Sequence, residues 1–292
     1  MSFPFDEGNP VQLDVLRTDQ LHPVISGNKW FKLKYNLIQA CESGSDELCS
    51  FGGAWSNHLH ALAYLGQLMG MRTLGIVRGE EHTVESTPML QDAHRFGMAL
   101  KFVSRRQFRH YRDHPGELAD ARRYVIPEGG DNALGMLGAA SLIQQSRVNW
   151  SAYSHVVLAV GTGCTFAGVR LALHPEIKLV GVSALKGAWV ERAMAKRMDK
   201  LANDNWSLDL NHHGGGFAQT NQSLLSFVSD FGDNTGIFLE PVYTGKAMMA
   251  LQDLIKSAVI PTGSRILFIH SGGLQGARGF DSDLTSTPRK FQ

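Results

Sequence analysis

The sequence predicts an α/β protein whose sheets are mostly parallel. Short apolar runs rich in β-branched residues alternate with segments that have the apolar spacing of helices. Clusters of glycine repeatedly follow the apolar runs, as in strand-to-helix turns. The 292 residues and the 43% hydrophobic content allow a large core, and the length exceeds the usual size of one domain. We therefore expect two domains, each an open, mostly parallel sheet flanked by helices.

The predicted elements follow one another along the chain. Pro88 suits the first turn of a helix, where its missing N–H costs nothing, and Gly70 and Gly97 suit the position after a helix, where glycine readily turns left-handed. The polar, glycine-rich stretch 203–219 is predicted to be a loop. Helices are predicted over 30–40, 56–69, 86–97, 133–147, a segment ending near 173, 187–201 and 244–257, and strands over 48–51, 73–77, 99–103, 123–126, 155–160, 178–182 and 265–270.

Charge and composition exclude several classes of partner. Lysine and arginine number 28 against 27 aspartates and glutamates, so no electrostatic attraction favours nucleic acid or an anionic membrane. No apolar run reaches the roughly 18 residues of a membrane span, and the start MSFPFDEGNP lacks the regions of a signal peptide. The three cysteines have no metal-ligand spacing and fit a reducing compartment. We expect a cytoplasmic protein without a metal site.

Four glycine-containing turns carry the candidate chemistry: 26–29, 52–57, 161–165 and 271–273. In open α/β sheets, ligands bind at the carboxyl ends of strands, so several such turns suggest one convergent pocket.

The turn Gly161-Thr162-Gly163-Cys164-Thr165 follows an apolar strand and begins a helix. Its hydroxyls and the N–H groups of a helix terminus favour a phosphate, although an ordinary strand-to-helix turn has the same pattern. It is no Walker loop, and Phe166 stands where a dinucleotide-binding fingerprint needs its third glycine.

Lys29 is the candidate for covalent chemistry. It lies at the start of a helix among apolar neighbours, and partial burial favours the neutral amine that forms a Schiff base. The alternative is a solvated surface lysine, which is the common case. Lys32 and Lys34 are its local competitors and are expected to face solvent.

Two further segments bring polar groups to helix starts. Ser56-Asn57-His58 opens a helix whose N–H groups suit a substrate carboxylate, while Ser56 equally reads as a plain N-cap. Tyr243 precedes another helix, and its phenol is either a candidate acid or base, or a buried aromatic with a bonded tip. Thr244 is the expected N-cap of that helix.

Together these segments resemble the family of 1-aminocyclopropane-1-carboxylate deaminase and D-cysteine desulfhydrase. That family belongs to the tryptophan-synthase-β-like group, fold type II, of pyridoxal 5'-phosphate (PLP) enzymes. Six stretches match in the family's order and span nearly the whole chain. They are Gly27–Lys29, Gly52–His58, Pro127–Gly130, Gly161–Gly168, Pro241–Met248 and His270–Gly273.

The resemblance implies a role for each candidate. Lys29 carries the cofactor as a Schiff base, and Asn57 binds its phenolic oxygen. Ser271 meets the pyridine nitrogen, with Thr244 as the second candidate. The phosphate lies against Gly161, Thr162, Gly163 and Thr165.

The substrate is a small amino acid in this family. By this resemblance Ser56, Asn57 and His58 would receive its carboxylate and Tyr243 would lie beside it, and either Lys29 or Tyr243 would move the α-proton. The resemblance also implies a small domain over 45–148, a large PLP-binding domain over 1–44 with 149–292, and a homodimer.

One departure from the family pattern bears on the reaction. Ring-opening deaminases carry a glutamate after the tyrosine, where this chain has Thr244. A hydroxyl does not keep the pyridine nitrogen protonated as a carboxylate does, so the ring is a weaker electron sink. This favours a D-cysteine desulfhydrase-type β-elimination that yields pyruvate, ammonia and sulfide. The second departure is at 214–219, which matches only loosely the region that supplies another active-site aromatic.

Other activities of the same scaffold stay open. One is ring opening of the cyclopropane amino acid to 2-oxobutanoate and ammonia. A racemase or a dehydratase for a hydroxy-amino acid, or a PLP-binding protein without turnover, also remains an alternative. D against L preference is undetermined by the sequence.

Overall fold

The computed structural model describes residues 11–201 and 203–280. The chain divides into two compact units, which we name by their place in the sequence. The terminal unit joins the N-terminal residues up to Gln20 with the chain from Ala139 onward, and the central unit runs from Leu21 to Gly138. Helix α1 (Asn28–Glu42) belongs to the compact central unit. The predicted domain limits instead place it in the large domain, over 1–44 with 149–292.

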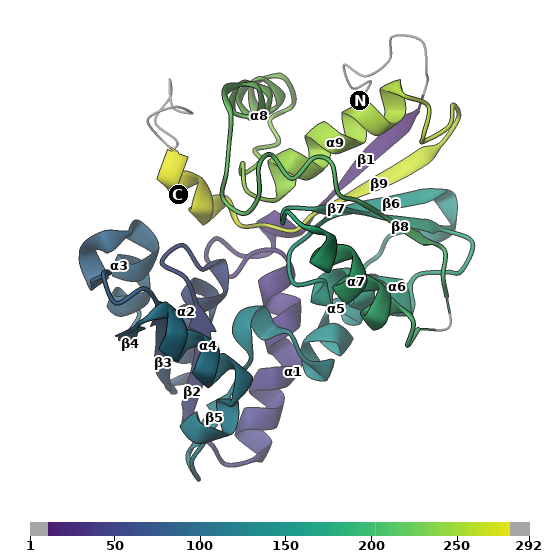
Figure 1. The fold of residues 1–292 in the computed structure, drawn as a ribbon. Coiled ribbons are helices and arrows are strands. Elements are labelled where there is room, and N and C mark those ends of the chain that lie inside the picture. The colour runs from purple at the N-terminus through teal and green to yellow at the C-terminus, as the bar shows by residue number, and fades with distance from the viewer. Residues whose placement is uncertain (1–10, 202, 281–292) are drawn as a thin grey trace. The chain divides into compact units, whose positions relative to one another are not determined.

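The terminal unit contains a five-stranded sheet in the order β1-β9-β6-β7-β8, and every neighbouring pair is parallel (Figure 1). Parallel strands end at one edge of a sheet, so the turns after β6 and β9 start from the same edge. The strands are β1 (Gln12–Arg17), β6 (His155–Val160), β7 (Lys178–Ser183), β8 (Trp206–Asp209) and β9 (Arg265–His270).

Helices cover both faces of this sheet (Figure 1). Val180 and Val182 pack in the core with α8 and α9, while the intervening Gly181 lies against the ring of Phe166 in α6. This alternation follows from the two-residue period of a strand. The helices are α6 (Cys164–Ala172), α7 (Ala188–Met198), α8 (Gln222–Thr235) and α9 (Thr244–Lys256).

The central unit has a four-stranded parallel sheet in the order β4-β3-β2-β5. Leu48 packs into the cluster that α1, α2 and α3 cover, and the next residue, Cys49, packs on the opposite face with Phe108 of α4. The elements are β2 (Glu47–Gly52), α2 (Asn57–Met69), β3 (Arg72–Arg78), α3 (Pro88–Arg95), β4 (Met98–Val103), α4 (Arg105–Asp113) and β5 (Arg123–Val125).

Helix α5 (Ala133–Gln145) spans the limit between the two units. Six short 3-10 turns complete the described chain: Thr18–Gln20, Val84–Ser86, Pro115–Leu118, Glu128–Gly130, Trp150–Ala152 and Leu274–Phe280. Among the described residues, no helix has both the length and the apolar character that crossing a membrane requires.

The predicted α/β class with parallel sheets is confirmed, and β6 and β9 have the predicted bounds. The prediction that 203–219 is entirely loop is wrong, because β8 adds a short edge strand there. Helix α4 was not predicted, since it buries only Phe108 and therefore shows no apolar stripe. Strand β1 and helix α8 were also missed, although Asn221 and Gly236 cap α8 at its two ends.

Candidate functional site

In the terminal unit, two predicted site segments begin at the carboxyl edge of adjacent strands. Strands β6 and β9 pair up to Val157 and Phe268. Val160 and Ser271 each lie three residues beyond that pair, at or just after the end of their strands. Ser271 is 8% exposed. The sheet register thus brings Ser271 and the glycine turn after Val160 to one edge.

The glycine turn enters α6 through Gly163, the N-cap residue. Its φ of 87° lies in the left-handed region, which glycine adopts without steric cost. Gly163 has no side chain, so this residue itself supplies no capping group that would offset the dipole of the nine-residue helix. Thr165 is buried and Thr162 is exposed. The turn therefore has the features of an anion site.

Tyr243 lies against this turn. A Cβ added at Gly161 would be 3.1 Å from Tyr243 Cε1 and 3.6 Å from Tyr243 Oη. Any larger residue at position 161 would push the tyrosine ring away. The structure thus brings together Tyr243 and the predicted phosphate turn, two segments that are distant in the sequence.

Thr244 is not the N-cap of α9 that the sequence predicts; it is the first residue of the helix. The buried carboxylate of Glu240 takes the capping role and accepts hydrogen bonds from the backbone N–H groups of Val242, Tyr243 and Thr244 at 2.8, 2.8 and 2.6 Å. The Thr244 hydroxyl lies 3.2 Å from Glu240 Oε1 and accepts from the Glu240 N–H at 3.0 Å. Burial raises the pKa of Glu240 against the opposing effect of these hydrogen bonds.

Lys246, two residues after Thr244 in α9, was not predicted to have a role. Its side chain is buried, and Nζ donates a hydrogen bond of 2.8 Å to the carbonyl of Gly216. Burial lowers the pKa of Lys246 to about 8, although the Glu240 carboxylate opposes this shift. Phe217, which follows Gly216 in the chain, meets Tyr243 edge to face with ring centroids 6.0 Å apart. The 214–219 segment thus does supply an aromatic neighbour to Tyr243.

In the central unit, Lys29 is the second residue of α1, after the N-cap Gly27. Its Nζ donates a hydrogen bond of 2.7 Å to Asn28 Oδ1. The expectation that Lys32 faces solvent is wrong, because Lys32 is only 3% exposed. It lies one turn after Lys29, and a Cβ added at Gly130 would be 3.5 Å from its Cβ. The Glu128–Gly130 turn therefore covers the Lys32 stem.

Ser56 is an N-cap, as its plainer interpretation predicts: its hydroxyl accepts a hydrogen bond of 3.1 Å from Leu59 N. Gly70 ends the same helix in the left-handed conformation, as predicted. Asn57 follows Ser56, and its Oδ1 is buried without a hydrogen-bond partner among the described residues. A buried amide oxygen without a partner is rare in proteins, and it is an acceptor that a ligand donor could satisfy.

His58 faces the interior of the central unit. Its Nε2 lies 2.9 Å from Ser50 Oγ, and the Ser50 hydroxyl donates to the carbonyl of Ile126 at 2.8 Å. Since that hydroxyl proton is committed, His58 Nε2 carries the hydrogen and Nδ1 holds a lone pair. Nδ1 is buried and has no partner within the described chain.

Electrostatics keep His58 neutral. Burial is the main cause that lowers its pKa well below 6.5, and the charges of Lys32 and Lys29 add to the shift. The influence of both lysines also indicates that they share one neighbourhood with this ring. His58 Nε2 is already hydrogen-bonded to Ser50. The role in substrate binding that the sequence predicts for His58 stays a prediction.

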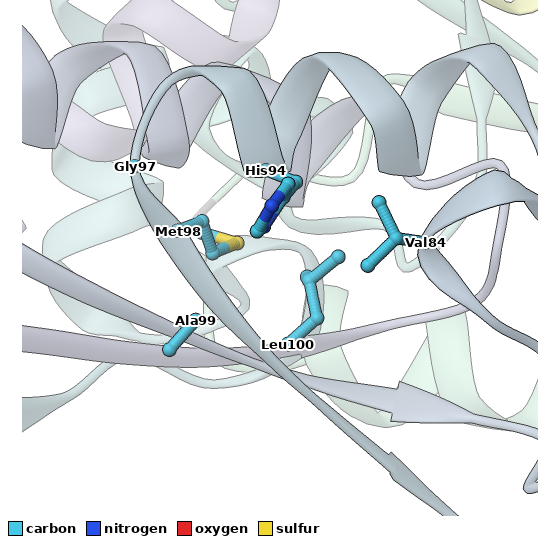
Figure 2. A pocket seen from close by; sticks show the side chains of 6 residues that line it. All are labelled: Val84, His94, Gly97, Met98, Ala99 and Leu100. Carbon is cyan, nitrogen blue, oxygen red and sulfur yellow. The ribbon is translucent and has the colours of Figure 1, made fainter.

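One pocket in the central unit lies apart from these residues, between α3 and β4 (Figure 2). Its volume is about 310 Å³, and none of the predicted site residues lines it. His94 is its one titratable lining residue. It is lined by Val84, His94, Gly97, Met98, Ala99 and Leu100.

The chain is similar to known proteins over most of its length. The model of the family described as pyridoxal-phosphate dependent enzyme matches residues 13–272. A D-cysteine desulfhydrase of Serratia proteamaculans (strain 568) is 28% identical over 286 residues, which cover 90% of this chain and 86% of that protein. A D-cysteine desulfhydrase of Yersinia pestis (strain Pestoides F) is 29% identical, with 88% and 86% covered.

Solved structures give the same result. The crystal structure of an ACC (1-aminocyclopropane-1-carboxylate) deaminase homologue superposes with a TM-score of 0.79 and 26% identity, over 93% of this chain and 87% of that one. An L-serine ammonia-lyase from Rhizomucor miehei has a TM-score of 0.67 at 14% identity, with 95% and 94% covered, and so shares the fold. With a family match over most of its length, the chain belongs to the pyridoxal-phosphate dependent enzymes.

Proposed function

We propose that this protein is a lyase that eliminates sulfide from D-cysteine. The overall reaction consumes D-cysteine and water and releases pyruvate, ammonia and hydrogen sulfide. The proposal is supported by relatives named D-cysteine desulfhydrase, which match about nine-tenths of the chain.

Residues in each unit have features that would suit the cofactor of the family. Lys29 would hold pyridoxal phosphate through its amine, and the turn Gly161, Thr162, Gly163 and Thr165 would receive the phosphate. The buried, unpartnered Oδ1 of Asn57 would accept from the phenolic hydroxyl. When bound, pyridoxal phosphate supplies an electron sink for the bonding pair released at the substrate α-carbon.

The capping role of Glu240 is the observation that favours elimination over ring opening. The Glu240 carboxylate accepts hydrogen bonds from three consecutive backbone N–H groups. It is therefore not available to keep the pyridine nitrogen of the cofactor protonated. The same contacts engage the Thr244 hydroxyl. These contacts support Ser271, rather than Thr244, as the proposed partner of the pyridine nitrogen. A hydroxyl partner makes a weaker electron sink, which suits a substrate whose sulfur is itself a good leaving group.

The chain's own groups then have distinct tasks. The first-turn N–H groups of α2, which Ser56 caps, would bind the substrate carboxylate through the helix dipole. The Lys29 amine or the Tyr243 phenol would take the α-proton. Phe217 packs on Tyr243 and limits the rotation of its ring.

A second candidate is ring opening of 1-aminocyclopropane-1-carboxylate to 2-oxobutanoate and ammonia. The superposition on the ACC deaminase homologue supports it. Thr244 in place of a glutamate argues against it, as described above. A PLP-binding protein without turnover would retain every contact of the cofactor and yield no product.

We also propose that the protein is a homodimer, as the family resemblance implies, and that it is cytoplasmic, as its three cysteines without metal-ligand spacing suggest. A large domain over 1–44 with 149–292 would bind the cofactor, and a small domain over 45–148 would contribute α2. Light scattering of the purified chain tests the dimer, and a mass of one chain would refute it.

The central test compares visible absorbance of the wild type, Lys29→Ala and the control Lys34→Ala, each with PLP. Lys34 lies on the same helix as Lys29, and its Nζ is 5.0 Å from the centroid of the Tyr35 ring. Lys34→Ala therefore controls for the loss of one positive charge from this helix. We expect a cofactor band in the wild type and in Lys34→Ala that Lys29→Ala lacks. With D-cysteine, sulfide and pyruvate should appear in equal amounts. A band independent of Lys29 would refute the lysine assignment, and 2-oxobutanoate from the cyclopropane substrate alone would favour the second candidate.

A further inference from the structure

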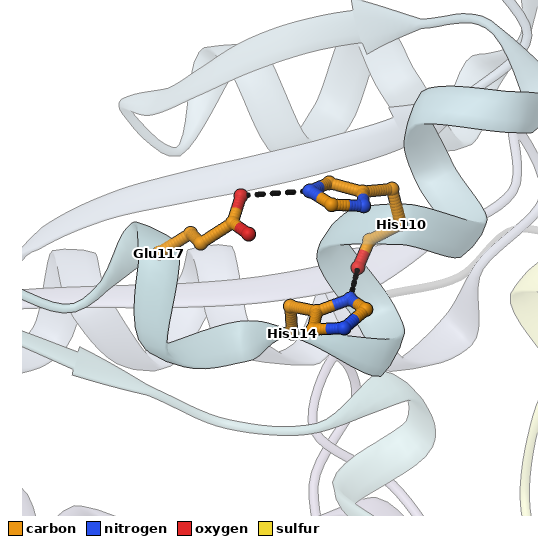
Figure 3. A group of neighbouring side chains, drawn as sticks. All are labelled: His110, His114 and Glu117. Atoms are coloured by element: carbon orange, nitrogen blue, oxygen red, sulfur yellow. Dashed lines mark hydrogen bonds and ion pairs between the residues drawn. The ribbon is translucent and has the colours of Figure 1, made fainter.

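Three metal-ligating side chains gather at the end of α4, apart from the residues assigned to the reaction (Figure 3). His110 lies in the last turn of α4, and His114 is the C-cap residue that follows the helix. The helix ends before His114, and the 3-10 turn Pro115–Leu118 brings Glu117 back toward them. All three side chains are exposed.

The distances within the cluster are close to those of a coordination shell. His110 Nε2 lies 2.8 Å from Glu117 Oε2, and the rings of His110 and His114 stack with centroids 4.8 Å apart. One ligand atom from each residue lies within 4.8 Å of the others. Bonds of about 2.0–2.2 Å to a tetrahedral zinc ion would separate such atoms by roughly 3.3–3.5 Å. Small rotations of exposed side chains achieve this.

One hydrogen bond already sets the tautomer that a metal needs. His114 Nδ1 donates to the carbonyl of His110 at 3.0 Å. Its Nε2 therefore holds the lone pair and points away from the backbone. Metal-binding histidines commonly donate their second ring N–H to a backbone carbonyl in this way, which fixes the ring orientation.

The local charges are compatible with a cation. The cluster sits at the carboxyl end of α4, where the helix dipole is negative. The nearby guanidinium of Arg112 is paired with Asp113 at 2.9 Å. Glu117 supplies the negative charge that offsets the ion.

We propose that His110, His114 and Glu117 form a binding site for a divalent transition-metal ion of the zinc class, with water in the open position. Two imidazoles and one carboxylate match the ligands of three-residue zinc sites, whereas magnesium and calcium prefer oxygen ligands alone. The ion would join α4 to the turn that follows and thereby stabilise the central unit. The site goes beyond the proposed reaction and does not depend on it.

The test is calorimetric titration of the untagged chain with Zn²⁺ alone. We expect one saturable site of micromolar affinity in the wild type. His110→Ala should weaken it by roughly tenfold or more, and Glu117→Gln should do so by a similar factor. His94→Ala is the matched control, because His94 is also exposed and in the last turn of a helix of the same unit. It should bind as the wild type does.

A second readout separates binding from folding. Zn²⁺ should raise the midpoint of thermal unfolding in the wild type and in His94→Ala, since a ligand of the native state stabilises it. At the same Zn²⁺ concentration the rise should be smaller in His110→Ala, whose midpoint without metal should match that of the wild type. Absent binding, or binding that His110→Ala leaves unchanged, for instance at His212 between Asp209 and Asp253, would overturn the proposal.

Discussion

Lys246 Nζ donates a hydrogen bond of 2.8 Å to the carbonyl oxygen of Gly216, inside the core of the terminal unit. A Cβ added at Gly214 would be 3.0 Å from Lys246 Cε, so the glycine segment wraps closely over the lysine stem. Gly216 precedes Phe217, whose ring meets Tyr243. Because Tyr243 lies one turn before Lys246, this bond holds the loop aromatic against the residue proposed to move a proton.

We predict that Lys246→Met raises KM for D-cysteine more than it lowers kcat, because Phe217 loses its fixed position. Above the lowered pKa of Lys246, where the buried amine is neutral, the substitution should also lower the free energy of unfolding by about 1–3 kcal/mol, since the Gly216 carbonyl loses its partner. Steady-state kinetics and urea unfolding measure the two effects. Lys256→Met, at the exposed end of the same helix, is the control. Equal KM values for Lys246→Met and the wild type would contradict a positioning role.

The lowered pKa of Lys246 predicts a rise of stability with pH. The folded value is about 8 against an ordinary 10.5, so between these values the unfolded chain binds a proton that the native chain has lost. Stability therefore increases as the pH rises through this window, and below it the cost of the buried charge is fully present. The unfolding free energy of the wild type, measured from pH 7 to 10 relative to that of Lys246→Met, should rise. A constant difference would refute this.

Acid should destabilise the central unit through His58. Its folded pKa lies well below the ordinary 6.5, so below that pH the unfolded state binds protons that the native ring does not accept. The contribution of the neutral His58 ring to the free energy of unfolding is fully present above pH 6.5 and decreases as the pH falls below it. His58→Gln should flatten this decrease, while the exposed His94→Gln should not. His155 and His270 have pKa values lowered by burial and should keep part of the effect in His58→Gln.

Mutations of the neighbouring residues Ser56 and Asn57 should affect different properties of the protein. Ser56→Ala removes a helix cap and should cost about 1 kcal/mol of stability in the cofactor-free chain. Asn57→Ala removes an oxygen without a partner, so it should leave that stability nearly unchanged and weaken PLP binding. Chemical unfolding and a PLP titration read the two properties. An Asn57→Ala chain that binds PLP as tightly as the wild type would exclude Asn57 from the cofactor site.

Local rules explain how much the sequence predicts. Ser56 caps α2 and Gly70 ends it, because both effects depend on residues within one helical turn. The order of strands and helices likewise follows from apolar spacing over a few residues. Helix α4 was not predicted because Phe108 is its one buried residue, so it has no apolar stripe. The family resemblance adds the roles of Lys29 and the glycine turns, which stay predictions at the level of single residues.

The sequence by itself thus determined the parallel α/β class, the turns at the strand ends and the family. Only the tertiary structure decided the contacts between distant segments. The Glu128–Gly130 turn buries Lys32, Ser50 selects the tautomer of His58, and Glu240 displaces Thr244 as a cap. The physical reason is that burial and hydrogen bonding of a charged group depend on what the folded chain brings to it. For Lys246, that partner is a carbonyl 30 residues earlier.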